Sequence, residues 1–268
     1  MRTRTLASGH EMPMLGLGTW EITKPQVLRA IELGYRHIDT AWAYRNQEFI
    51  GESVRECGLD RNYLFITSKA WHFWLDYDGV QRQFDDTMDQ LGLDYVDLYL
   101  VHWPNDAVPI AETLRAFEEI VAERRARSIG VANFDVPRLQ AAMSATSIPM
   151  AVNQFRFNPH HFPEDALEFC DRSDVVVTAY TPLELGAVGE DTVLQDIGRR
   201  HGKTPGQVAL RWIVQKGVVV IPKAGSEHHQ RENMDIFDWN LSNVEVRRID
   251  ALGRVSGRNV TPDWRPDL

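Results

Sequence analysis

Four polar side chains that together could transfer a proton follow three successive hydrophobic segments of the chain. Asp39 and Tyr44 come at the end of the first segment, Lys69 closes the second, and His102 closes the third. A carboxylate buried at a strand end needs a partner, because an unpaired charge away from water is costly. We expect Lys69 to be the partner of Asp39.

The chemistry that this group predicts is general acid catalysis by Tyr44. A neighbouring Lys ammonium lowers the pKa of a phenol from its ordinary value of about 10, so that the phenol can give up its proton. Taken singly, each residue has a simpler explanation: a capping Asp, a packed Tyr, a surface Lys or a core His. Their joint occurrence at consecutive strand ends favours the catalytic interpretation.

The segments that carry these residues belong to a longer alternation of strands and helices. Short β-rich segments are expected at residues 14–20, 37–40, 64–69, 96–102, 128–133, 150–154, 175–180 and 218–223. Helical patterns are expected at residues 25–33, 47–57, 80–91, 110–125, 136–143, 164–170, 192–215 and 227–235.

This alternation predicts an α/β fold, a single (β/α)8 TIM barrel that spans residues 1–268 as one domain. Residues 3–12 carry Ser8-Gly9 between β-prone pieces and predict a short N-terminal β-hairpin. In a parallel barrel, catalytic groups gather at the C-terminal ends of the strands. An open doubly wound sheet is the alternative, but Gly16-Leu17-Gly18 lacks the third glycine of a dinucleotide-binding Rossmann loop, and no helix opens there.

Composition and charge exclude several classes of protein. The net charge of −9 comes without a basic stripe, so nucleic-acid binding is not expected. No stretch approaches the ~18 apolar residues that a membrane span needs. Residues 1–6 lack the apolar part of a signal peptide, so we expect a cytoplasmic protein with no membrane association. Cys57 and Cys170 are expected to be buried, reduced thiols.

A metal site is not expected from the paired histidines, His160-His161 and His228-His229. Adjacent residues on a regular element point apart, and no cluster of Cys or carboxylate residues completes a ligand shell.

The ordered motifs of the chain resemble those of the aldo-keto reductases, in particular prokaryotic-type members with a short C-terminal tail. The resemblance covers nearly the whole chain. It rests on Gly16-Leu17-Gly18-Thr19-Trp20, Asp39-Thr40-Ala41 with Tyr44, Thr67-Ser68-Lys69-Ala70-Trp71, His102-Trp103-Pro104, Ile129-Gly130-Val131-Ala132-Asn133-Phe134, Asn153-Gln154, Ala179-Tyr180-Thr181-Pro182-Leu183, Ile221-Pro222-Lys223 and Arg231-Glu232-Asn233.

The resemblance implies an NAD(P)H-dependent oxidoreductase that reduces aldehydes and ketones to alcohols. Tyr44 would donate the proton, Asp39 and Lys69 would lower its pKa, and His102 would orient the substrate carbonyl. Ionised Tyr44 could act as the base in the reverse oxidation. The main alternative is a non-catalytic, regulatory or redox-sensing subunit that binds the cofactor on the same fold.

The resemblance also assigns residues to the cofactor. Asn133 and Gln154 would bind the nicotinamide carboxamide, Tyr180 would stack on the nicotinamide ring, and Thr181 and Leu183 would lie along the pyrophosphate. Residues assigned to other parts of the cofactor are Thr19, Trp20, Lys223, Ser226, His229, Glu232 and Asn233.

The choice between NADP(H) and NAD(H) depends on the adenosine end of the site. Lys223 and the free N–H groups of the helix that starts near Ser226 suit a 2′-phosphate, so NADP(H) is favoured. NAD(H) stays open as the alternative, since His229 and Ala224 replace the Arg and Ser of many relatives. Ala132 likewise replaces the family's usual Ser and removes a hydroxyl contact.

Four tryptophans are expected around the substrate. Trp20, Trp71 and Trp103 follow strands, and Trp264 lies in the C-terminal segment. An aromatic pocket suits a small apolar or aromatic carbonyl compound. The family resemblance implies a monomer most often, and the identity of the substrate cannot be decoded from the pocket loops.

Overall fold

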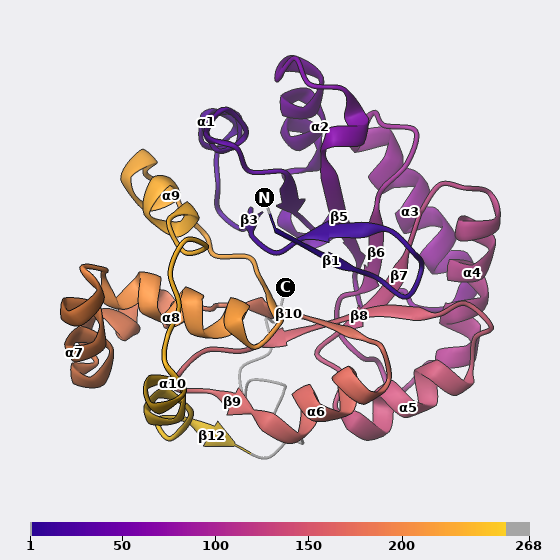
Figure 1. Cartoon of the computed structure of the whole chain (residues 1–268). Helices are drawn as coiled ribbons and strands as arrows, with labels where there is room; N and C mark the ends of the chain where they lie inside the picture. Colours follow the sequence, from indigo (N-terminus) through magenta and orange to yellow (C-terminus); the bar gives the residue numbers. More distant parts are fainter. Residues whose placement is uncertain (1, 256–268) are drawn as a thin grey trace.

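A parallel barrel forms the centre of the molecule, as the computed structural model shows over its described residues, 2–255 (Figure 1). Neighbouring strands pair in parallel in the order in which they follow along the chain. A bridge between Leu15 and Val220 joins the two ends of the sheet, so the predicted TIM barrel is confirmed. Its strands are β3 (Gly16–Gly18), β4 (His37–Asp39), β5 (Phe65–Ala70), β6 (Leu98–Val101), β7 (Ile129–Ala132), β8 (Met150–Arg156), β10 (Val176–Tyr180) and β11 (Val219–Val220).

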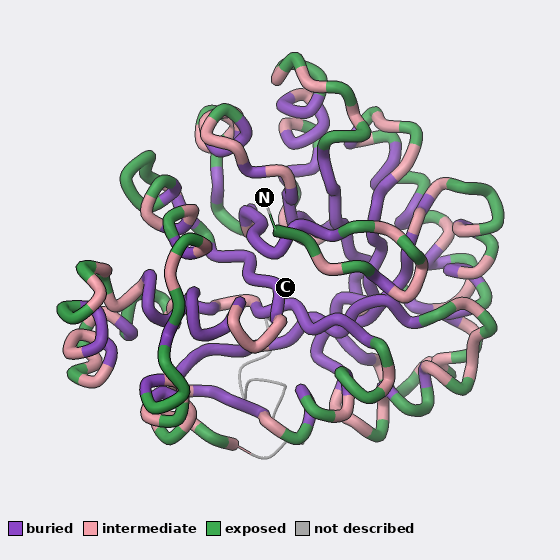
Figure 2. Tube along the Cα trace, viewed as in Figure 1, coloured by how far each residue is buried: buried purple, intermediate pink, exposed green. Residues whose placement is uncertain are grey.

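Helices surround the barrel and bury one face against it; Figure 2 shows their outer faces exposed and the strands buried. The predicted helical region 192–215 is two helices, because Gly202 ends the first at a positive φ of 63° and Thr204 caps a second that opens on Pro205. The helices are α1 (Lys24–Leu33), α2 (Gln47–Glu56), α3 (Tyr77–Leu91), α4 (Ile110–Ala122), α5 (Val136–Ser144), α6 (Glu164–Arg172), α7 (Thr192–His201), α8 (Pro205–Gln215), α9 (Glu227–Met234) and α10 (Asn243–Asp250).

The predicted hairpin closes the N-terminal end of the barrel. Strands β1 (Thr3–Thr5) and β2 (Glu11–Pro13) pair antiparallel. Leu6 and Met12 from this hairpin pack in one buried cluster with residues from the N-terminal halves of barrel strands, such as Phe65 and Leu98. The hairpin therefore fills one end of the barrel, and the opposite end, at the C-termini of the strands, is left for a site.

Two short strands, β9 (Phe162–Pro163) and β12 (Arg254–Val255), pair in parallel outside the barrel. Neither these strands nor α10 was expected from the sequence. Cys170 is a buried free thiol, as expected, whereas Cys57 is a free thiol that is only half-buried. Among the described residues, no helix is both long and apolar enough to cross a membrane.

Candidate active site

A large pocket opens at the C-terminal ends of the barrel strands, with a volume of about 730 Å³. That volume lies in the range of small-molecule and cofactor sites. The pocket brings together sixteen of the predicted site residues: Thr19, Trp20, Asp39, Tyr44, Trp71, His102, Trp103, Asn133, Gln154, Tyr180, Thr181, Leu183, Lys223, His229, Glu232 and Asn233. Lys69 is not among the lining residues and lies behind them, and Trp264 lies outside the described residues.

The base of the pocket holds the ion pair expected between Asp39 and Lys69. The Lys69 Nζ donates to Asp39 Oδ1 at 2.5 Å and to the carbonyl oxygen of Thr40 at 2.9 Å. Gln154 Nε2 donates to the other carboxylate oxygen of Asp39 at 2.8 Å. Burial alone would lower the pKa of Lys69, but Asp39 and Tyr44 together raise it above its ordinary value. Lys69 is therefore a fixed cation at the base of the pocket.

Tyr44 stands beside this cation, at the end of a short 3-10 helix, η1 (Trp42–Tyr44). The Lys69 Nζ lies 5.1 Å from the centre of its ring. The expected net decrease in the Tyr44 pKa is wrong for this structure: burial raises the pKa, and the Lys69 charge lowers it by less. Part of the Tyr44 side chain is accessible from the pocket. The surrounding protein nevertheless favours the neutral phenol over the charged phenolate. Tyr44 thus retains its proton at neutral pH.

His102 follows strand β6 directly and lines the same end of the pocket. Its ring centre is 5.6 Å from that of Tyr44 and 5.2 Å from that of Trp71. Burial, and then the charge of Lys69, hold the pKa of His102 well below 6.5. Its Nδ1 is buried with no hydrogen-bond partner in the part of the chain that the structure describes. The imidazole is therefore neutral at pH 7 and carries one N–H.

Asn133 and Tyr180 form the next part of the wall. The Tyr180 hydroxyl donates to Asn133 Oδ1 at 2.7 Å, and Asn133 Nδ2 donates to the carbonyl oxygen of His102 at 3.0 Å. Asn133 has a positive φ of 64°, a conformation that Asn adopts more readily than most residues. These bonds fix the expected cofactor-facing residues relative to His102.

The outer end of the pocket, lined by Lys223, His229 and Glu232, differs in part from what the sequence predicts. The Lys223 Nζ lies 2.6 Å from Glu21 Oε2 and 5.5 Å from the centre of the Trp20 ring. Ser226 does not line the pocket; its hydroxyl accepts from the backbone N–H of His229 and caps helix α9. One of the N–H groups predicted to be free for an anion is therefore already bonded.

Two residues near the site were missed by the sequence reasoning. Buried Asn46 accepts from the Thr40 hydroxyl at 2.5 Å and donates to the carbonyl oxygen of Thr19 at 2.9 Å, which joins two strand ends. An Asn directly before a helix is a recognisable signal, although it suggests a cap rather than this bridge. Glu21 gave no signal, because its partner Lys223 is far away in the sequence.

Comparisons with known proteins identify the family of the chain. The aldo/keto reductase family model matches residues 14–254. The chain is 38% identical over 266 residues to the glyoxal reductase of Bacillus subtilis (strain 168), covering 97% of this chain and 96% of that protein. It is 34% identical over 265 residues to a methylglyoxal reductase of Escherichia coli (strain K12), covering 96% and 95%.

A solved structure agrees as well. The aldose reductase from Schistosoma japonicum superposes with a TM-score of 0.90 at 31% identity, covering 95% of this chain and 94% of that one. The family model spans all the barrel strands and the strand ends that carry the pocket residues. The chain belongs to the aldo/keto reductase family.

Proposed function

We propose that this protein reduces aldehydes and ketones to alcohols with NADPH as the favoured cofactor and with Tyr44 as the proton donor. The observation that carries the proposal is the cluster of Asp39, Lys69, Tyr44 and His102 at the base of one pocket. The same pocket extends to Lys223 and Glu232 at its outer end, as an elongated cofactor requires.

The residues present fit a nicotinamide cofactor. Amide groups of Asn133 and Gln154 line the pocket beside the catalytic cluster, where a carboxamide needs both donors and acceptors. Tyr180 offers an aromatic wall at the same level, tied through its hydroxyl to Asn133. A bound nicotinamide would supply the hydride for the reduction.

The protein's own residues supply the proton and stabilise the charge. Tyr44 keeps its proton at neutral pH and can pass it to a carbonyl oxygen that gains negative charge. The phenolate left behind is stabilised by the Lys69 ammonium, whose own charge is held by Asp39. Neutral His102 can donate its N–H to the same oxygen, as a second preorganised donor.

The preference for NADP(H) rests on Lys223, which lines the outer end of the pocket. Its ion pair with Glu21 weakens the argument, because a carboxylate there competes with a phosphate for the same ammonium. His229 and Ala224 leave this end without the Arg and Ser of many relatives. Use of NAD(H) is therefore the alternative that the first experiment must distinguish.

The substrate side of the pocket is aromatic. Trp20, Trp71 and Trp103 line it, and flat apolar walls favour small carbonyl compounds with little charge. Glyoxal and methylglyoxal are the first compounds to test, because two similar proteins are named as reductases of these substrates.

The test has two parts. Titration with NADPH and with NADH, followed by tryptophan fluorescence, measures cofactor binding without a choice of substrate. Turnover of glyoxal, methylglyoxal and a set of aromatic aldehydes is then compared between wild type and Tyr44→Phe. We expect tighter binding of NADPH, and a decrease of kcat by about 10²–10⁴-fold in Tyr44→Phe with cofactor binding retained.

Tyr63→Phe is the matched control, since Tyr63 is an exposed tyrosine outside the pocket. Wild-type turnover by Tyr44→Phe would overturn the role of Tyr44. Cofactor binding by the wild type without turnover of any carbonyl would favour the non-catalytic cofactor-binding alternative. Failure of both dinucleotides to bind would overturn the proposal as a whole.

A further inference from the structure

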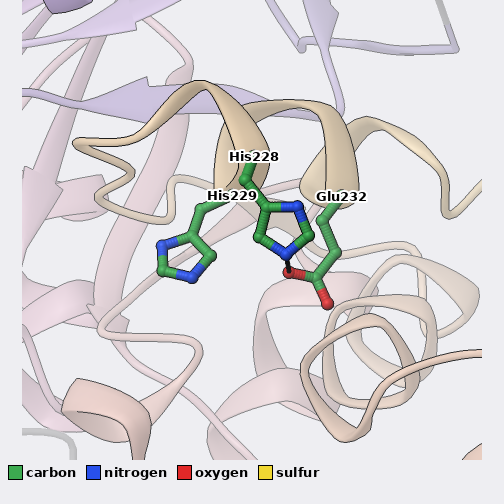
Figure 3. Close-up of side chains that lie close together, drawn as sticks. All are labelled: His228, His229 and Glu232. Carbon is green, nitrogen blue, oxygen red and sulfur yellow. Dashed lines mark ion pairs between the residues drawn. The ribbon is translucent and has the colours of Figure 1, made fainter.

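Helix α9 carries three side chains of the types that bind metal ions, near the outer end of the pocket. The ligand atoms of His228, His229 and Glu232 all lie within 4.8 Å of one another (Figure 3). His228 Nε2 is 3.8 Å from Glu232 Oε2. The ring centres of His228 and His229 are 5.5 Å apart, so the expectation that these adjacent histidines point away from each other is wrong here.

The spacing of the three residues explains this convergence. His228 and Glu232 are four residues apart and lie on the same face of the helix. His229 is three residues from Glu232, and its ligand nitrogen lies within 4.8 Å of the ligand atoms of the other two residues. The nearby Arg231 bonds to Glu227 at 2.8 Å, so its guanidinium is engaged away from the cluster.

Two imidazoles and one carboxylate are typical ligands of Zn²⁺ and related transition-metal ions. Such ions bind at about 2.0–2.2 Å from each ligand atom, usually with four ligands in a tetrahedron. The exposed histidine side chains can adjust by small rotations to reach that geometry. A fourth position would remain open to water.

We propose that His228, His229 and Glu232 bind a divalent transition-metal ion of the Zn²⁺ type, and that the bound ion blocks the outer end of the pocket. Two of the three ligands, His229 and Glu232, line the pocket, whereas His228 does not. An ion held by all three therefore takes up the Glu232 carboxylate at the end of the pocket where the adenosine of a dinucleotide would lie. The blocking half of the proposal rests on the proposed function; the metal site itself does not.

The site is tested first without cofactor, by calorimetric titration of the full chain with Zn²⁺ alone. We expect one site of micromolar affinity in the wild type and binding that is weaker by about tenfold or more in His228→Ala, since a ligand is lost. His228→Cys replaces the imidazole by another zinc ligand and should retain the site. His10→Ala and Glu168→Gln, which remove an imidazole and an exposed carboxylate outside the cluster, should bind Zn²⁺ as the wild type does.

The blocking is tested by titration with NADPH at increasing Zn²⁺ concentrations. The apparent Kd of NADPH should rise with Zn²⁺ in the wild type and stay constant in His228→Ala, which also controls for zinc held by the phosphates of the free cofactor. Equal Zn²⁺ affinity of wild type and His228→Ala, or no binding by either, would overturn the metal site. Unchanged or tighter NADPH binding in the presence of Zn²⁺ would overturn the blocking alone, and failure of NADPH to bind without Zn²⁺ would count against the proposed function.

Discussion

The Lys69 ammonium lies 2.5 Å from an oxygen of the Asp39 carboxylate, and the side chains are 0% and 2% exposed. Removing two charges from water is expensive, and their attraction in the interior offsets this only while both partners are present. Gln154 satisfies the second carboxylate oxygen, and the Thr40 carbonyl takes another Lys69 proton. The pair is therefore both the electrostatic support of Tyr44 and a point at which stability is sensitive to substitution.

Replacing one partner of this pair should destabilise the fold strongly. Asp39→Asn and Lys69→Met each leave a buried charge or polar group uncompensated, and each should lower the free energy of unfolding by about 3–5 kcal/mol. The double variant should recover part of this loss. Urea unfolding measures it, with Glu52→Gln in the partly exposed Lys24–Glu52 pair as a control expected to cost far less. Single variants as stable as that control would contradict the prediction.

Much of this site could be predicted from the sequence because parallel strands share an edge. Once Asp39, Lys69 and His102 are placed at the ends of successive strands, the barrel topology brings them close together. The bond from Gln154 to Asp39 could not be predicted in this way, since it crosses the barrel between β8 and β4, which are not neighbours in the sheet. Such a contact depends on the closure of the barrel and on side-chain rotamers.

The direction of the Tyr44 pKa shift shows a second limit. The sequence identifies the neighbouring Lys69 cation, which lowers the Tyr44 pKa as expected. It does not reveal the degree of burial, which raises this pKa by more than Lys69 lowers it. The Glu21–Lys223 pair illustrates a third limit: its two residues come from opposite ends of the chain, and only the bridge that closes the barrel makes them neighbours.

Acid should destabilise the fold through His37, at the start of strand β4. His37 is fully buried, and burial lowers its pKa to about 4. Below about pH 6.5, His37 binds a proton in the unfolded chain but stays neutral in the folded protein. The stability that comes from neutral, buried His37 is therefore fully present above pH 6.5 and is lost as the pH falls toward 4. Between about pH 7 and pH 4.5 the free energy of unfolding should fall by about 2.5 kcal/mol less in His37→Gln than in the wild type. Denaturant titrations at both pH values check this, and an equal pH dependence in the two proteins would contradict it.

Glu21 should weaken the preference for NADPH. Its carboxylate holds Lys223 at 2.6 Å, and both side chains are largely exposed. Glu21→Gln releases the ammonium for a 2′-phosphate, so the Kd of NADPH should fall by about two- to fivefold, as expected for an exposed ion pair, while the Kd of NADH stays the same. The gain should shrink at high salt, because exposed charges are screened. Glu168→Gln, which breaks the exposed pair with Arg172 on helix α6, is the matched control, and an equal effect on both cofactors would show that Glu21 acts in some other way.

His160 should make one wall of the pocket sensitive to alkaline pH. Its Nδ1 lies 2.7 Å from Glu184 and its Nε2 lies 2.9 Å from Asp191. These carboxylates stand at the two ends of the segment η3 (Glu184–Glu190), which helps to line the pocket. Only the protonated ring can donate to both.

The sign of the pH effect follows from the His160 pKa. Partial burial acts to lower this pKa, but the hydrogen bonds and charges of Asp191 and Glu184 outweigh it, and the pKa is raised. The pair of hydrogen bonds from His160 to Glu184 and Asp191 is therefore complete below about pH 6.5 and is lost as the pH rises through the raised His160 pKa. Hydrogen-exchange protection factors of residues 184–191 should fall between about pH 6 and pH 9 in the wild type. In His160→Gln, whose amide cannot donate from two opposite ends, protection should be low at both pH values; a wild-type pH dependence in this variant would show that another group controls the segment.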